Sequence, residues 1–105
     1  MKESKILGML GLAARARKIA FGADSVESEI IKKKSKLIVI AKDASDRTKE
    51  KFQKLTNENS IELIEICTID EISKKIGKSN KAVISIYDTN IANQIKKING
   101  GVDIG

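Results

Sequence analysis

Apolar residues recur along the 105-residue chain with two spacings, one typical of helices and one typical of buried strands. Near the N-terminus, Ile6, Leu10 and Ala14 repeat at helical spacing. They predict a first helix over about residues 5–17, with Ser4 as its N-cap. Four short apolar runs predict strands: IAF (19–21), LIVIA (37–41), IELIEI (61–66) and AVISI (82–86).

Polar residues and glycines mark where the other predicted helices begin and end. Two pairs have the spacing of a capping box, which satisfies free amide groups at a helix start: Asp24 with Glu27, and Thr68 with Glu71. The other predicted boundaries are Ser45 or Asp46, Asp88 or Thr89, and a left-handed C-cap at Gly77. The residues expected to face inward from these helices are Val26, Ile30, Ile31, Phe52, Leu55, Ile72, Ile76, Ile91, Ile95 and Ile98. The run KSNK, residues 78–81, is expected to be a solvated loop.

The alternation of helices and strands determines the predicted fold class. It predicts an α/β fold, a three-layer α/β/α sandwich in which helices cover both faces of a small, four-stranded mixed sheet, with its strands largely parallel. The length suits one unit with a modest core. We therefore expect a single domain over residues 1–105.

Composition excludes several classes of protein. Apolar residues make up 41% of the chain and charged residues 32%, and no apolar run approaches the roughly 20 residues of a membrane span. The N-terminal residues lack the pattern of a secretory signal, so the expected location is cytoplasmic. With one cysteine, Cys67, and no histidine, the sequence offers no internal disulfide and no Cys/His zinc cluster. We expect neither a metal nor another cofactor.

The charge is unevenly distributed. The formal net charge is +6, and the first 36 residues hold nine basic and four acidic residues, a local net charge of +5. Such a bias favours polyanionic partners. The three aromatic residues are Phe21, Phe52 and Tyr87, too few to predict an aromatic platform for single strands. A nucleic-acid partner is therefore expected to be folded.

An enzymatic function is one alternative. Asp43 and Asp88 each follow an apolar strand, where α/β sheets commonly bind ligands, and could form a magnesium or phosphoryl site. Both also precede predicted helices, where aspartate is favoured by free amide groups. The chain has no histidine base, no phosphate-binding GxxxxGK[ST] loop and no GxSxG elbow, so the main expectation is a non-enzyme. A metal-dependent phosphoryl-accepting domain at Asp43 stays open as the less favoured alternative.

A binding surface at the start of the second helix is the other hypothesis. Gly22 allows a sharp turn and a close approach, and Asp24, Ser25 and Ser28 follow it with donors and acceptors next to free helix amides. The basic residues that could hold phosphates nearby are Arg15, Lys18, Lys32, Lys33 and Lys34. The three lysines are equally explained as cations at a helix C-terminus. A protein-interaction module that uses the same helix end is a further alternative.

The stretch GADSVESEIIKKKSKLIVIAKDAS resembles the signature of the L-seven-Ae ribosomal protein family, whose members bind kink-turn RNA. Gly22, Ala41 and Asp43 keep the family's places, and GLAARARK is similar to the bacterial YlxQ-like branch. The resemblance implies an α/β/α sandwich without a cofactor that binds structured RNA, kink-turn-like or ribosomal.

The resemblance also assigns contacts. Asp24, Ser25 and Ser28 stand where the family has Asn, Glu and Lys, which read sheared G·A pairs and support phosphates. Each lost base-edge pair is expected to cost roughly 1–3 kcal/mol of discrimination. The family's second contact packs apolar atoms around a flipped-out base, here by position Ile66, Thr68 and Ile69. Ile69 is equally explained as a hydrophobic staple of the following helix.

Overall fold

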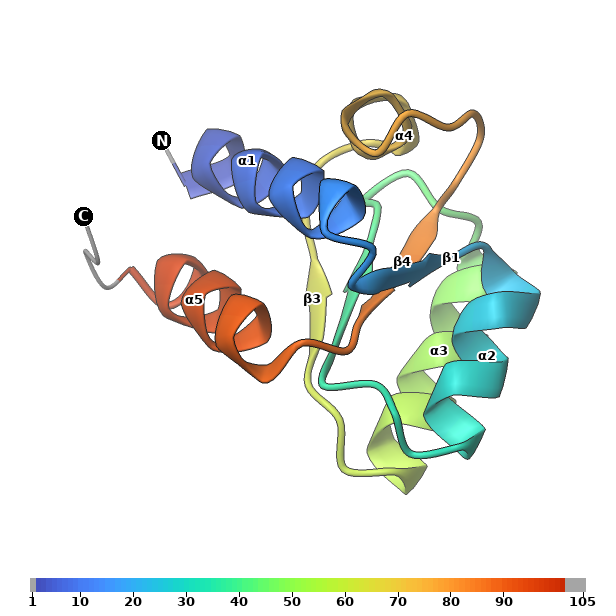
Figure 1. The fold of residues 1–105 in the computed structure, drawn as a ribbon. Helices are drawn as coiled ribbons and strands as arrows, with labels where there is room; N and C mark the ends of the chain where they lie inside the picture. Colours follow the sequence, from blue (N-terminus) through green and yellow to red (C-terminus); the bar gives the residue numbers. More distant parts are fainter. Residues whose placement is uncertain (1, 102–105) are drawn as a thin grey trace.

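Within residues 2–101, which the computed structural model describes, five helices alternate with four strands (Figure 1). The helices are α1 (Lys2–Arg15), α2 (Ala23–Ile31), α3 (Asp46–Glu58), α4 (Ile69–Lys75) and α5 (Thr89–Asn99). The strands are β1 (Ile19–Phe21), β2 (Leu37–Ile40), β3 (Leu63–Glu65) and β4 (Val83–Ile86). Every predicted element is present, although three of the strands are shorter than their apolar runs. No helix among these residues is long and apolar enough to cross a membrane.

The four strands form one mixed sheet in the order β1-β4-β2-β3. Only β2 and β3 pair in parallel, because β4 runs antiparallel to both of its neighbours. The expected mixed sheet is confirmed, and the expectation of largely parallel strands is wrong. The connection from β3 through α4 to β4 begins and ends at the same end of the sheet, so β4 runs back against β2. Figure 1 shows α4 end-on above the sheet, so it crosses the end of the sheet and β4 starts where β3 finishes.

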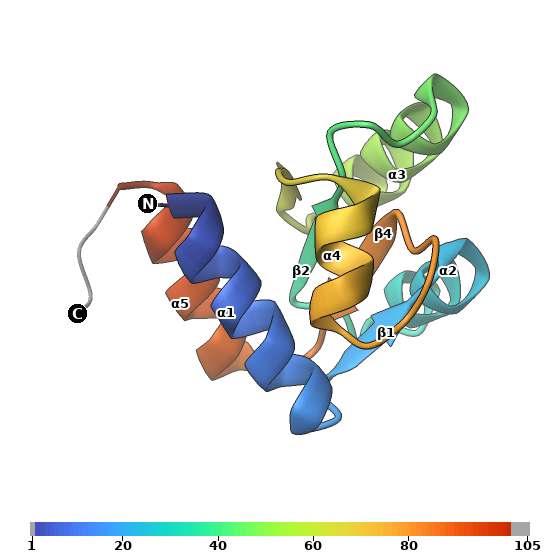
Figure 2. The same ribbon diagram turned by 90° about the horizontal axis from the view of Figure 1, so that it is seen from above.

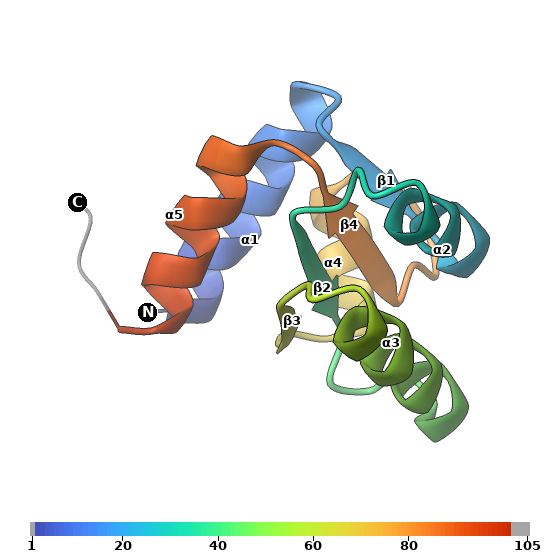
Figure 3. The same cartoon turned by 90° about the horizontal axis from the view of Figure 1, so that it is seen from below.

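Helices cover both faces of the sheet, as predicted. Helices α1, α4 and α5 pack on one face and α2 and α3 on the other, which the two views along the sheet show (Figures 2 and 3). In β2, Leu37 and Val39 join the first core, whereas Ile38 and Ile40 join the second. This two-sided burial explains why LIVI is continuously apolar instead of alternating.

Most of the predicted helix boundaries are confirmed, but Ser4, the predicted N-cap of the first helix, lies inside α1, which ends at Arg15. Thr68 and Glu71 form a reciprocal capping box at the start of α4. Ser45 accepts a hydrogen bond from the Thr48 amide, and Asp88 accepts one from the Ile91 amide. Gly77 follows α4 with a φ of +74°, as expected for a left-handed C-cap.

The start of α2 differs from the prediction. Gly22 is the N-cap, and no side chain caps this helix, so the expected Asp24–Glu27 capping box is wrong. The Gly22 amide still donates to the Val83 carbonyl oxygen of the sheet, at 3.1 Å. Its φ of 87° and ψ of 151° lie in a region essentially reserved for glycine, so the chain turns into the helix immediately. Ile31, expected inside, is 62% exposed.

Candidate nucleic-acid interface

Three strands finish and one begins at the same end of the sheet, which we call the upper end. It consists of the residues that follow β1, β2 and β3 and the residues that precede β4 (Figure 1). Helices α2, α3 and α4 start there, because each follows one of the three strands. Helix starts carry free amide groups and a partial positive charge, so this end suits hydrogen-bond acceptors and anions.

The first turn of α2 is the most open of these helix starts. Asp24 and Ser25 are exposed, and the first helical hydrogen bond runs from the Val26 amide to the Gly22 carbonyl oxygen at 3.0 Å. The preceding amides of the helix receive no side-chain cap. Amide donors, a carboxylate and a hydroxyl are thus presented together. A carboxylate accepts from base amino groups, whereas free amides can donate to phosphates.

Ser28 lies one turn further along α2. It is half-buried and lines a shallow hollow of about 340 Å³ with Asp24, Ile31 and Lys32 among its neighbours. The hollow runs along the outer side of α2. It therefore connects the open first turn with the C-terminal end of the helix.

Two lysines that the sequence prediction assigned only to a solvated loop lie beside Phe21 and Gly22. Lys81 Nζ would lie 3.8 Å from a Cβ atom built on Gly22. Lys78 and Lys81 place their Nζ atoms 5.0 and 5.5 Å from the centre of the Phe21 ring. The Lys81 amide donates to Ser73 Oγ at 2.8 Å, which holds the loop against α4. In the sequence, the run KSNK before β4 is the sign of these two lysines. It places them at the upper end only when the antiparallel direction of β4 is known.

The second predicted contact region is only partly available. Ile66 is 2% exposed and belongs to the core, so its side chain does not reach the surface. Thr68 caps α4, and Ile69 is half-buried against the α1 side of the sheet. Ile69 and Thr68 therefore have structural roles at the upper end and present only part of their surface there.

Four of the remaining predicted contacts, Lys18 and Lys32 to Lys34, lie at the other end of the sheet, the lower end. Lys32 is the C-cap of α2, and the exposed Lys33 and Lys34 follow it. Lys18 lies just before β1, where its carbonyl oxygen accepts from the Tyr87 amide at the end of β4. Arg15, in the last turn of α1, comes within 3.5 Å of the Cβ position of Gly11. The structure therefore does not bring these cations together with Gly22, Asp24 and Ser25.

The two aspartates of the enzymatic alternative are also separated. Asp43 Oδ1 accepts from the Ile69 amide at 2.8 Å and links the end of β2 to the start of α4. Asp88 caps α5 at the lower end, because β4 runs antiparallel to β2. The two carboxylates thus lie at opposite ends of the sheet and cannot share a metal ion. Each carboxylate accepts a hydrogen bond from an amide group at the start of a helix, which was the structural alternative in the sequence analysis.

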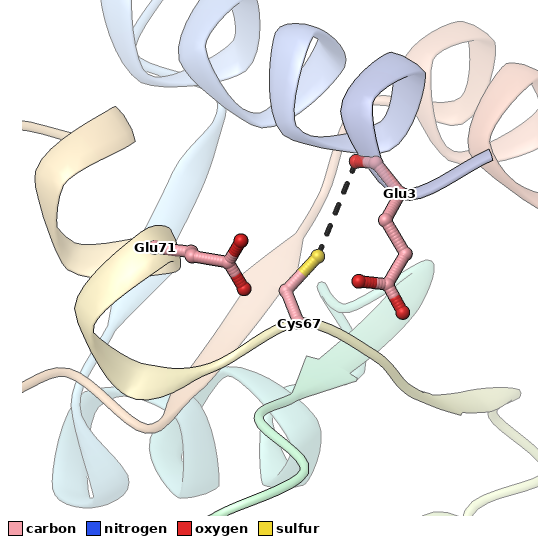
Figure 4. Close-up of side chains that lie close together, drawn as sticks. All are labelled: Glu3, Cys67 and Glu71. Carbon is pink, nitrogen blue, oxygen red and sulfur yellow. Dashed lines mark hydrogen bonds between the residues drawn. The ribbon is translucent and has the colours of Figure 1, made fainter. Parts of the chain in front are cut away.

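A cluster of Glu3, Cys67 and Glu71 has potential metal ligands within 4.8 Å of one another, the one such group in the described part of the chain (Figure 4). Each member has a structural partner: Glu3 pairs with Lys42, Glu71 accepts from the Thr68 amide, and Cys67 is buried near the Glu3 carbonyl. Burial raises the pKa of the Cys67 thiol to about 11, so the thiol stays protonated at neutral pH. The hydrogen bond and charge of Glu3 raise the pKa of Lys42. These contacts account for the three side chains as structural groups of the fold.

The sequence pattern described as the "Ribosomal protein L7Ae/L30e/S12e/Gadd45 family" matches residues 4–96. The chain is 32% identical to "RNA-binding protein YlxQ" of Enterococcus faecium over 96 residues, 91% of this chain and 92% of that protein. It is also 32% identical to "RNA-binding protein YlxQ" of Bacillus subtilis (strain 168) over 87 residues, 83% of this chain and 87% of that protein.

Solved structures share the fold. A protein of unknown function from Bacillus halodurans C has a TM-score of 0.87 at 27% identity and covers 91% of this chain and 97% of its own. The Giardia lamblia 15.5kD RNA binding protein has a TM-score of 0.80 at 20% identity and covers 96% of this chain and 87% of its own. The second likeness shows the fold alone. From the match over residues 4–96 and the two relatives at 32% identity, this chain belongs to the ribosomal protein L7Ae/L30e/S12e/Gadd45 family.

Proposed function

We propose that this chain is a cytoplasmic, non-catalytic protein that binds structured RNA, kink-turn-like or ribosomal, with residues 1–105 acting as one RNA-binding domain. The observation that carries the proposal is the uncapped first turn of α2 beside two lysines. Amides, Asp24 and Ser25 meet the bases there, and Lys78 and Lys81 meet phosphates. The family and the relatives named as RNA-binding proteins support this function.

The lysines and the first turn of α2 are expected to make different kinds of contact with RNA. Lysine ammonium groups neutralise phosphates without reading sequence, so they supply affinity that depends on salt. Lys78 and Lys81 form no ion pair with another described residue, whereas Lys42 and Lys74 are paired with Glu3 and Asp70. These two lysines, and the exposed Arg47 at the start of α3, form none of the ion pairs of the described residues and are free for phosphate at the upper end. Arg15, Lys18 and Lys32 to Lys34 would contact RNA that extends past α2 to the lower end.

The experiment is fluorescence anisotropy with labelled RNA at two salt concentrations. The three RNAs are a kink-turn, a matched duplex and ribosomal RNA fragments. We expect binding that weakens as salt rises, because phosphate contacts release counterions. A preference for the kink-turn would mean that Asp24 and Ser25 still read sheared pairs. No affinity for any RNA at low salt would overturn the proposal.

A further inference from the structure

A second hollow lies beside the edge strand β1, away from the first turn of α2. Its volume is about 340 Å³, at the small end of the roughly 300–1,000 Å³ that ligand pockets span. Figure 2 shows that the C-terminal part of α1, β1 and α4 come together in this region. The lining residues are Ala14, Arg17, Ile19, Phe21, Ile76, Lys78 and Tyr87.

This hollow contains two of the three aromatic residues of the chain, which the sequence does not place together. Tyr87 donates its hydroxyl to the Arg17 carbonyl oxygen, so its ring is fixed beside the end of α1. Phe21 and Tyr87 are both half-buried, and Lys78 Nζ lies 5.0 Å from the centre of the Phe21 ring. An aromatic side chain with accessible surface can stack on a nucleobase of any sequence.

The polar atoms around these rings suit a nucleotide. Arg17 and Lys78 are the charged lining residues, and no acidic residue lines the hollow. Neither cation forms an ion pair among residues 2–101. In the antiparallel pairing of β1 with β4, Lys18 and Gly22 bond to β4, so the intervening Ile19 and Phe21 direct their backbone groups outward. Those groups are free donors and acceptors for a base.

Lys78 links this hollow to the proposed RNA-binding end. It also lines a hollow at the start of α4 with Asp43, Ile69 and Asn80 among its neighbours. Lys78 therefore lines both hollows, so an RNA strand bound at the upper end can reach β1 along the loop of residues 78–81.

We propose that the β1 hollow receives one unpaired nucleotide of the bound RNA. The base stacks against Phe21 and Tyr87, and the phosphate contacts Arg17 and Lys78. This inference rests on the proposed function and assigns the contact with one unpaired nucleotide to the β1 hollow.

Tyrosine fluorescence tests the proposal directly. Tyr87 is the single tyrosine and the chain has no tryptophan, so its emission reports on this hollow. The probes are two labelled hairpins with the same stem, one with a single unpaired nucleotide and one fully paired. We expect the first to quench Tyr87 and the second to leave the emission unchanged, with anisotropy recording binding of each. A free nucleoside monophosphate at the same concentration should not quench, and quenching equal to that by RNA would overturn the assignment to RNA.

Two variants separate stacking from folding. Phe21→Leu should weaken binding of the hairpin with the unpaired nucleotide about 5- to 100-fold while leaving the paired hairpin unchanged. Arg17→Gln, at an exposed position, should weaken the same hairpin several-fold and keeps the test valid if Phe21→Leu fails to fold. Lys54→Ala, exposed on α3 on the other face of the sheet, is the matched control and should change neither.

The failures are distinguishable. Equal affinity of the two hairpins with unchanged Tyr87 emission would overturn this inference and leave the proposed function standing. Absence of binding by both hairpins at low salt would overturn both.

Discussion

Lys81 lies over Gly22, with its Nζ 3.8 Å from the position that a Cβ atom on Gly22 would occupy. Gly22 itself has a φ of +87°, which side chains of L residues rarely adopt. The close approach of Lys81 to the start of α2 therefore depends on a backbone conformation at residue 22 that glycine alone adopts readily. A Gly22→Val variant would block close approach, but a β-branched residue does not tolerate a φ of +87°, so this variant would also disturb the fold.

We predict that Gly22→Ala lowers the free energy of unfolding by about 1–3 kcal/mol, because the strained backbone outweighs the gain from a less flexible unfolded chain. Urea unfolding followed by circular dichroism measures this change. Gly8→Ala is the control, since Gly8 lies in α1 with nothing within 4 Å of its Cβ position. It should stabilise the chain by up to about 1 kcal/mol. Equal effects of the two substitutions would contradict the role given to the backbone at Gly22.

Asp24 and Ser45 should respond differently to alanine. Ser45 accepts from the Thr48 amide, so Ser45→Ala is expected to cost about 1 kcal/mol of stability. Asp24 makes no cap bond, so Asp24→Ala should change stability by less than about 0.5 kcal/mol. If Asp24→Ala weakens RNA binding with its melting temperature unchanged, the effect is on the interface. If Asp24→Ala instead lowers the free energy of unfolding by about 1 kcal/mol, the Asp24 side chain caps α2 in solution.

Pairs of lysines at the two ends of the sheet can be ranked by salt dependence. Lys78→Ala with Lys81→Ala should weaken RNA binding across sequences and lower the salt slope by about 1.5, as expected for two lost phosphate contacts. Lys32→Ala with Lys34→Ala tests the lower end in the same way. Lys54→Ala with Lys97→Ala, both exposed and outside these surfaces, is the charge-matched control. An unchanged slope for either of the first two pairs would remove that pair from the interface.

Cys67 should make stability fall at high pH. Burial raises its thiol pKa from an ordinary 9.0 to about 11, so the folded chain holds this proton more tightly than the unfolded chain does. The contribution is complete below about pH 9 and is lost as pH rises through 11, by about 2–3 kcal/mol at most. Unfolding of the wild type and Cys67→Ala across pH 8–11 measures it. Lysine and tyrosine ionise in both proteins, so parallel curves would contradict the assignment to Cys67.

Local chemistry allowed much of the fold to be predicted from the sequence. The capping box of Thr68 and Glu71 and the caps Ser45 and Asp88 involve partners three residues apart, so each was recognisable from its own segment. The continuous apolar run LIVI predicted a strand with helices on both faces, because burial on both sides removes the alternation of polar residues. The start of α2 was also predicted from its own segment, because Gly22 is followed directly by polar residues next to free helix amides.

Tertiary structure decided the rest, because it depends on pairing between residues far apart in the chain. The antiparallel direction of β4 separates Asp43 from Asp88 and brings Lys81 to Gly22. The bond from the Gly22 amide to Val83 ends β1 and replaces the expected cap at Asp24. Pairing of β1 with β4 also places Phe21 and Tyr87 in one hollow, although 66 positions (87 − 21) separate them. Local residue spacing specifies the elements, whereas the long-range backbone hydrogen bonds of the sheet set their direction and so the composition of the binding surface.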